Sequence, residues 1–285
     1  MARKVAPVVI MFYVTRYMFK VSVLYEDKDV LVLNKPAGLA AHSDGRTDEP
    51  TLADWIIENY PAMKNVGEPL KLKTENSRPT EQSFGRVKLK TISRPGIVHR
   101  LDKETSGAMV IAKNPPTFIF LKKQFQDREV EKTYRAFVYG ELKQNEGVID
   151  RPIARSRKDF RMWSAQRGAR GKEREAVTEY SVLSRIPATV REKGDGTGFS
   201  FINVRPKTGR THQIRVHLKA INHPIVCDKL YAPKRECALG FKRTALHAFS
   251  VAFSLPSGKH LKVEAPYPAD FQTALLIFEN RKTDD

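Results

Sequence analysis

Alternating apolar residues near the start of the chain predict its first strands. Val21, Val23 and Tyr25 fall at every second position, and after an acidic turn the chain is apolar again over residues 30–33. A period of two residues places every second side chain on the same face of a strand. We therefore expect residues 21–35 to form a β-hairpin.

The same alternation over residues 131–142 predicts a strand in the middle of a sheet. Tyr134, Ala136 and Val138 fall on one face of this strand, and the opposite face is also largely aromatic. Because both faces carry side chains suited to burial, neighbours are expected on both sides. Further strands are predicted at residues 97–98, 108–112, 176–183, 199–204, 244–255 and 261–265.

Helical spacing of apolar residues predicts four helices. Thr51 is expected to cap the first, with Asp54 three positions later completing a variant of the capping box. Thr117 is expected to cap the second. The third lies within residues 205–224 and the fourth at residues 270–279.

This order of elements indicates an α+β fold. Strands outnumber helices and adjoin in sequence, which favours a mixed or antiparallel sheet with peripheral helices. We expect one domain over residues 21–280. Residues 1–20 hold a short apolar run after Arg3 and Lys4, too short to span a bilayer. We interpret them as a leader, with Met18 as an alternative start of translation, and expect no association with a membrane.

The chain is strongly basic: 50 Lys and Arg residues stand against 32 Asp and Glu, a formal net charge of +18. Such a charge favours a polyanionic partner, nucleic acid first and an anionic membrane surface second; a merely basic protein is the alternative. Cys227 and Cys237 are too few for a disulfide framework or a zinc site. We therefore expect two unpaired thiols, no metal, and a reducing compartment, the cytoplasm.

Two segments concentrate the positive charge. Residues 71–94 are polar and basic and are expected to form a surface insertion with a small hairpin around Val87 and Leu89. Residues 151–176 hold nine Lys or Arg against three acids. Phe160 and Trp163 lie among them and could stack on bases. A solvated loop is the alternative. The residues expected to contact RNA here and before the third helix are Arg155, Arg157, Lys158 and Arg210.

Residues 97–113 carry the candidate chemistry. A polar loop over residues 99–107 places Asp102 among small hydroxyl residues, between two apolar runs. Glycine-rich nucleotide loops, a GxSxG elbow and a histidine triplet are absent from the sequence, so a nucleotide cofactor, a serine hydrolase and a zinc site lack support. Asp102 could act as a nucleophile or a base beside an arginine that keeps it ionised. A charged hairpin loop without chemistry is the alternative.

The stretch IVHRLDKETSGAMVIAK at residues 97–113 closely resembles the HRLD signature of the RluA family of RNA pseudouridine synthases. Three further stretches resemble that family in the same order and at similar spacing, over about residues 21–280. They are VLYEDKDVLVLNKPAGL, EKTYRAFVYGEL, and RPKTGRTHQIRVHL followed by LHAFSV. Four ordered matches are far more specific than one.

The resemblance implies a long, mostly antiparallel central sheet with a cleft across its middle, and isomerisation of uridine to pseudouridine in RNA without cofactor or metal. Asp102 matches the family's catalytic aspartate. Tyr134 matches the tyrosine that packs on the target uracil and is implicated in removing the C5 proton. Arg215 matches the arginine that pairs with the aspartate, and Arg100 a residue that occupies the space left by the flipped nucleotide.

The resemblance leaves the RNA target open. The pattern is most similar to the branch that modifies large-subunit ribosomal RNA, but several of those members carry an S4-type domain, and none is expected before residue 21. Transfer RNA and a non-catalytic role in RNA binding or ribosome assembly are the alternatives; a nucleoside hydrolase is disfavoured because no second carboxylate pairs with Asp102. We expect a monomer, and hydrogen-bonding structural roles for His99 and His212.

Overall fold

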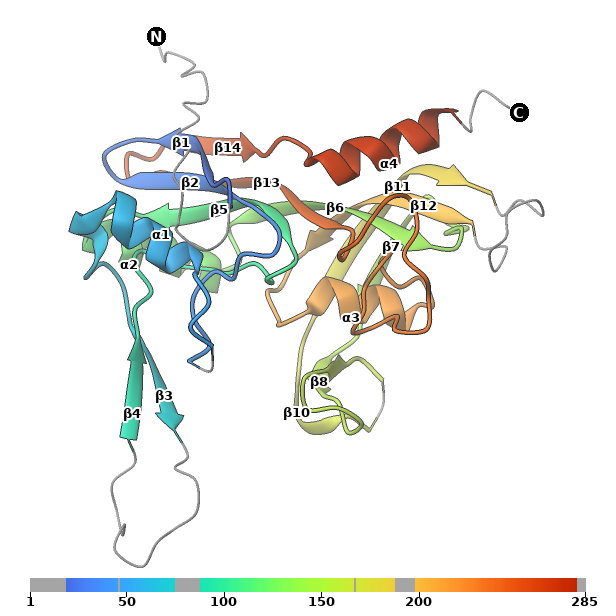
Figure 1. Cartoon of the computed structure of the whole chain (residues 1–285), viewed down its shortest axis with the longest axis horizontal. Coiled ribbons are helices and arrows are strands. Elements are labelled where there is room, and N and C mark those ends of the chain that lie inside the picture. The colour runs from blue at the N-terminus through green and yellow to red at the C-terminus, as the bar shows by residue number, and fades with distance from the viewer. Residues whose placement is uncertain (1–18, 46, 75–87, 167, 188–197, 281–285) are drawn as a thin grey trace, which may run out of the picture.

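The computed structural model describes residues 19–45, 47–74, 88–166, 168–187 and 198–280 (Figure 1). The expected leader and the alternative start at Met18 lie outside these ranges. A long sheet runs through the molecule, and its strand order brings distant parts of the sequence side by side.

The sheet has nine strands among the described residues, in the order β1-β2-β5-β13-β6-β12-β11-β7, with β14 paired to β13. Their bounds are Ser22–Glu26 (β1), Val30–Lys35 (β2), Ser106–Ala112 (β5), Glu131–Tyr139 (β6), Glu146–Asp150 (β7), Val177–Ile186 (β11), Phe199–Pro206 (β12), Leu246–Ser254 (β13) and His260–Glu264 (β14). Neighbours are antiparallel except β5 and β13, which pair in parallel. The prediction of a mixed, mostly antiparallel sheet is confirmed, as are the hairpin of β1 and β2 and the central place of β6 between β13 and β12.

In the described part of the chain, four α-helices pack on the sheet: Leu52–Asn59 (α1), Pro115–Gln126 (α2), Gln213–Ala220 (α3) and Ala269–Asn280 (α4). The helix α4 lies along one side of the sheet, and α1 and α3 lie on the other (Figure 1). Thr51 and Asp54 form the expected capping box of α1. The cap predicted for α2 is wrong: the cap is Asn114, three residues before Thr117, and it accepts a hydrogen bond from the Thr117 backbone N–H. The two prolines after Asn114 fit the first turn, where their missing N–H groups are not needed.

The core is divided into two main apolar clusters that meet near the middle of the sheet. One is built on β1, β2 and β5 with α1 and α2, and the other on β6 and β12 with α3 and α4. Tyr134, on β6, packs against both clusters. A side chain at this junction is held from two sides, which fixes its orientation.

Two small sheets extend from the same side of the molecule (Figure 1). One is the hairpin of Leu70–Thr74 (β3) and Lys88–Ile92 (β4), which confirms the hairpin predicted there; Leu89 lies in β4, and Val87 is outside the described ranges. The other has three strands, Ile153–Arg155 (β8), Trp163–Ser164 (β9) and Arg170–Arg174 (β10). The most basic stretch of the chain is therefore folded into a compact sheet.

The expectation of unpaired thiols is wrong. Cys227 and Cys237 form a disulfide that closes a loop after α3, with ten residues of sequence separation. Cysteine number and spacing hold no information on which side chains the fold brings together, so the pairing follows from the path of this loop alone.

Candidate active site

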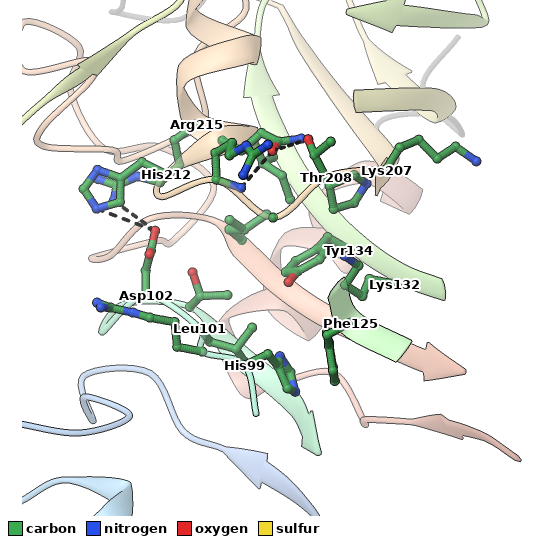
Figure 2. Close-up of a pocket in the computed structure, with 18 of the residues that line it drawn as sticks. His99, Leu101, Asp102, Phe125, Lys132, Tyr134, Lys207, Thr208, His212 and Arg215 are labelled. Atoms are coloured by element: carbon green, nitrogen blue, oxygen red, sulfur yellow. Dashed lines mark hydrogen bonds and ion pairs between the residues drawn. The ribbon is translucent and has the colours of Figure 1, made fainter. Parts of the chain in front are cut away.

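A cavity of about 580 Å³ opens where the Asp102 loop, β6 and the start of α3 converge (Figure 2). Five of the residues predicted to act on RNA line this cavity: Arg100, Asp102, Tyr134, Arg210 and Arg215. The other three do not line it, because they lie in β8 of the three-stranded sheet or in the turn after it: Arg155, Arg157 and Lys158. The structure thus joins five of the eight candidate residues in one site.

Asp102 lies in the loop before β5 and is partly exposed to the cavity. Its Oδ2 atom accepts a hydrogen bond of 3.2 Å from Nη1 of Arg215. The Nε2 atom of His212 lies 3.9 Å from the same oxygen. Two nitrogen-bearing side chains from the start of α3 therefore face one carboxylate oxygen, while the rest of the carboxylate remains open to a substrate (Figure 2).

Two basic side chains, the buried Lys35 and the partly buried Arg243, hold the backbone of the Asp102 loop in place. The fully buried Lys35 donates from Nζ to three carbonyl oxygens, those of Pro36, Leu39 and Lys103, at 2.8, 2.8 and 3.1 Å. Burial lowers the pKa of Lys35 to about 7. From the other end of the loop, Arg243 donates to the Glu104 carbonyl oxygen at 3.0 Å. Lys35 and Arg243 each contact a backbone carbonyl oxygen of the loop, and neither contact occupies the Asp102 side chain.

Gly107 lets the strand after the loop approach its parallel neighbour closely. Its φ of +116° is unfavourable for residues with a side chain, and a Cβ atom there would lie 2.2 Å from the Ala248 carbonyl oxygen. Only glycine fits between β5 and β13 at this point. The close pairing sets where the chain turns back toward Asp102.

Tyr134 projects from β6 into the cavity, with its hydroxyl directed to the side on which Asp102 lies (Figure 2). Burial, followed by the nearby negative charge of Asp102, raises the pKa of Tyr134 well above its ordinary value. The phenol therefore keeps its proton near neutral pH. Its ring is a flat apolar surface at the floor of the site.

Arg215 is fixed by two residues that the sequence did not single out. Its Nε and Nη2 atoms donate to the two oxygens of Asp228 at 2.7 and 2.8 Å, a bidentate pair. Its guanidinium carbon lies 4.9 Å from the centre of the Tyr231 ring. An acid and a tyrosine within the apolar stretch after residue 223 were the available signal, but nothing in the local pattern assigned them to Arg215.

The two histidines at the site differ in role. His99 accepts a hydrogen bond from the Val110 N–H at 2.9 Å and stacks on Phe125, and burial lowers its pKa to about 3. The predicted structural role of His99 is confirmed. His212 bonds through Nδ1 to the Tyr231 hydroxyl at 2.9 Å, as predicted for a structural residue, but it also faces Asp102.

The cavity wall is strongly cationic. The cations that line it are Arg94, Arg100, Arg128, Lys132, Lys207, Arg210 and Arg215, and Asp102 is the one acid among the described lining residues. Glu175 pairs with Arg128, and Glu179 with Lys207. Within the described ranges, no acidic side chain pairs with Arg94, Arg100 or Lys132, and Nε of Arg94 is buried without a hydrogen-bond partner.

Four of these cations, Arg94, Arg128, Lys132 and Lys207, were missed from the sequence. Lys132 could have been found, because it shares a strand face with Tyr134. No group of three His, Cys, Asp or Glu side chains suited to a metal occurs in the described part of the chain. None of the described helices is both long and apolar enough to cross a membrane.

Comparison with known proteins shows which family this chain resembles. Residues 29–220 match the family model described as RNA pseudouridylate synthase. The chain is 35% identical over 267 residues to an uncharacterized RNA pseudouridine synthase of Aquifex aeolicus, covering 91% of this chain and 73% of that protein. It is 32% identical over 269 residues to ribosomal large subunit pseudouridine synthase D of Zymomonas mobilis, covering 91% and 74%.

The fold has known counterparts as well. The structure titled human RNA pseudouridylate synthase domain containing 4 superimposes with a TM-score of 0.63 at 24% sequence identity, covering 90% of this chain and 92% of that one. At this identity the likeness concerns the fold.

Proposed function

The chain belongs to the RNA pseudouridylate synthase family, and we propose that it converts specific uridines of structured ribosomal RNA to pseudouridine with Asp102 as the reacting group. The observation that carries the proposal is the placement of Asp102, Arg215 and Tyr134 in one cationic cavity. Each of these residues was assigned from the sequence, and they come from three separate elements of the fold.

The reaction rearranges one nucleoside without adding or removing atoms. The bond from ribose C1′ to uracil N1 breaks, a bond from C1′ to C5 forms, and the proton on C5 is lost while N1 gains one. Asp102 attacks the target nucleoside, and the uracil rotates before it is rejoined. Arg215 orients the carboxylate through its Nη1 hydrogen bond and favours its ionised form.

Tyr134 packs against the uracil during this rotation. Because its pKa is raised by burial, the residue is a neutral phenol at working pH. A neutral phenol can take the C5 proton only if its own proton moves on in the same step, so its part in proton removal is a relay rather than that of a free base.

The cationic wall suits an RNA strand from which one nucleotide has been flipped out. Flipping costs a few kcal/mol of lost stacking and pairing. Phosphate contacts from Arg94, Arg100, Lys132 and Arg210 offset this cost. Arg100 is exposed at the rim, where it can fill the space left by the flipped nucleotide. The three-stranded sheet supplies further contacts through Arg155, Arg157 and Lys158.

Large-subunit ribosomal RNA is the proposed target because two relatives, from Zymomonas mobilis and Borreliella burgdorferi, bear that function in their names. Transfer RNA is the second candidate. Action as a monomer in the cytoplasm is part of the same proposal, which requires the Cys227–Cys237 disulfide to persist in a reducing compartment.

Tritium release tests the activity directly. The purified protein is incubated with ribosomal and transfer RNA that carry tritium at uracil C5, and release to water reports each isomerisation. Release from large-subunit RNA, together with pseudouridine positions that vanish from cells lacking the gene, supports the proposal. Release from transfer RNA alone reassigns the target, and no release from any RNA rejects the activity.

A further inference from the structure

The loop between Cys227 and Cys237 folds against the guanidinium of Arg215 and is tied at its ends by the disulfide. Asp228 follows directly after the first cysteine, and Tyr231 lies three residues further on. Both side chains contact Arg215, and neither of them lines the cavity.

Both carboxylate oxygens of Asp228 already accept hydrogen bonds from the protein. Its side chain is fully buried. Its Oδ2 atom accepts from Nε of Arg215, and its Oδ1 atom accepts from Nη2 of Arg215 and from the backbone N–H groups of Leu230 and Tyr231 at 3.1 and 3.0 Å. A buried carboxylate with all these donors is held in one orientation.

Tyr231 supports the same arrangement from a second direction. Its ring packs on the Arg215 guanidinium, and its hydroxyl bonds to Nδ1 of His212 and accepts from the Trp163 backbone N–H at 3.0 Å. Trp163 belongs to β9 of the three-stranded sheet. The loop therefore contacts both nitrogen-bearing side chains that face Asp102.

We propose that Asp228 is a positioning residue for the isomerisation: it holds Arg215 so that Nη1 is the donor presented to Asp102. The inference rests on the proposed function and deepens it. Bidentate pairing uses the Nε and Nη2 edge of the guanidinium, which fixes its plane and leaves the Nη1 edge for Asp102. Without Asp228, Arg215 is free to rotate, and the Asp102 carboxylate loses its fixed rotamer.

The first test is Asp228→Asn. The amide is close in size to the carboxylate, but its NH₂ group would face a donor of Arg215, so the bidentate pair cannot form. We expect kcat for tritium release to fall about 10²-fold, while the Kd for RNA changes less than about threefold, because the loss concerns the geometry of the reacting group. Asp54→Asn, which removes an acid from the capping box of α1 outside the cavity, is the matched control and keeps kcat.

Chemical rescue separates positioning from folding. In Arg215→Gly, added guanidinium at millimolar concentration is expected to bind Asp228 and restore part of kcat in a saturable manner. In the double variant with Asp228→Asn the rescue is lost. A kcat within about threefold of wild type in Asp228→Asn, or equal rescue in the single and double variants, overturns the proposal.

An experiment without substrate keeps the two proposals distinguishable. In ¹⁵N-arginine-labelled protein, a guanidinium fixed by three hydrogen bonds gives resolved Nη–H signals. These signals are expected for Arg215 in wild type and in Asp54→Asn, and lost in Asp228→Asn. Signals that persist in Asp228→Asn overturn the positioning role. A wild-type protein that isomerises no RNA rejects the proposed function, while the signals still report on the role of Asp228.

Discussion

Arg215 donates from Nη1 to Oδ2 of Asp102 over 3.2 Å, although 113 residues separate the two in sequence. The arginine comes from α3 in one half of the molecule, and the aspartate from the loop before β5 in the other. The sheet that runs between these halves makes the contact possible. Activity should therefore depend both on the two side chains and on the pairing of the strands that carry them.

Replacing the carboxylate should abolish the reaction and spare the binding of RNA. Asp102→Asn keeps the shape of the side chain but removes the nucleophile, so tritium release should fall about 10³-fold or more. The Kd for RNA should be nearly unchanged. Glu104→Gln, an exposed acid two positions later in the same loop, is the matched control and should retain activity. Undiminished release by Asp102→Asn would rule out the proposed mechanism.

The basic three-stranded sheet should contribute to RNA affinity through charge. Neutralising Arg155, Arg157 and Lys158 together should weaken RNA binding and make its salt dependence shallower. The negative slope of the logarithm of the binding constant against the logarithm of the salt concentration should shrink in magnitude by up to about 0.7 for each lost contact with single-stranded RNA.

A matched triple variant tests whether position matters as well as charge. Lys28, Lys259 and Lys262 are exposed and line no part of the cavity. Their neutralisation should leave the salt slope close to that of wild type. If the variant of the three-stranded sheet keeps the wild-type slope, the RNA-binding surface lies elsewhere.

Acid should destabilise the fold through the partly buried His99 and the fully buried His247. Burial lowers the pKa of His99 to about 3 and that of His247 to about 4. In the unfolded chain both titrate near pH 6.5, so below that pH the unfolded state binds protons that the folded state does not. Above pH 6.5 the two histidines cost the fold nothing. As the pH falls from 6.5 toward the folded pKa of each histidine, the free energy of unfolding decreases by about 1.4 kcal/mol per pH unit for each of them.

Urea unfolding at pH 7 and pH 5 measures this loss. His99→Gln removes one titrating group while its amide oxygen can still accept from the Val110 N–H. The difference in the free energy of unfolding between the two pH values should be smaller in this variant than in wild type. An equal difference would show that His99 does not contribute to the acid sensitivity.

Gly107→Ala should be strongly destabilising. The added Cβ would meet the Ala248 carbonyl oxygen at 2.2 Å, and the φ of +116° is strained for alanine. We expect a loss of about 3 kcal/mol or more, measured by thermal or urea unfolding. At Gly209 a Cβ would meet nothing within 4 Å, so Gly209→Ala should change stability by less than about 0.5 kcal/mol.

Reduction of the Cys227–Cys237 disulfide should lower stability by about 2–3 kcal/mol, as expected from the entropy gained when a short loop is opened in the unfolded chain. Alkylation in denaturant, before and after reduction, counts the thiols by mass. Two alkylated cysteines before reduction would show that the bond is absent in the isolated protein.

Much of the local structure was determined by the sequence because it depends on neighbours in the chain. The alternation around residues 21–35 and 131–142 defined strands, since a pleat repeats every two residues. The capping box of Thr51 and Asp54 acts within one turn. The error at α2 has a local cause too: Asn114 is the better cap, and the two prolines after it favour the first turn. The motif around Asp102 was enough to propose this residue as the reacting group.

Other features required the tertiary structure because their partners are distant in sequence. The parallel pairing of β5 and β13, the disulfide, and the convergence of Arg94 and Lys132 on one cavity follow from how the strands are ordered. The sequence pointed to Asp102 and Arg215 as separate residues. Only the fold decided that Arg215 presents a single donor to Asp102, because Asp228, which no local pattern assigned to Arg215, occupies the other edge of its guanidinium.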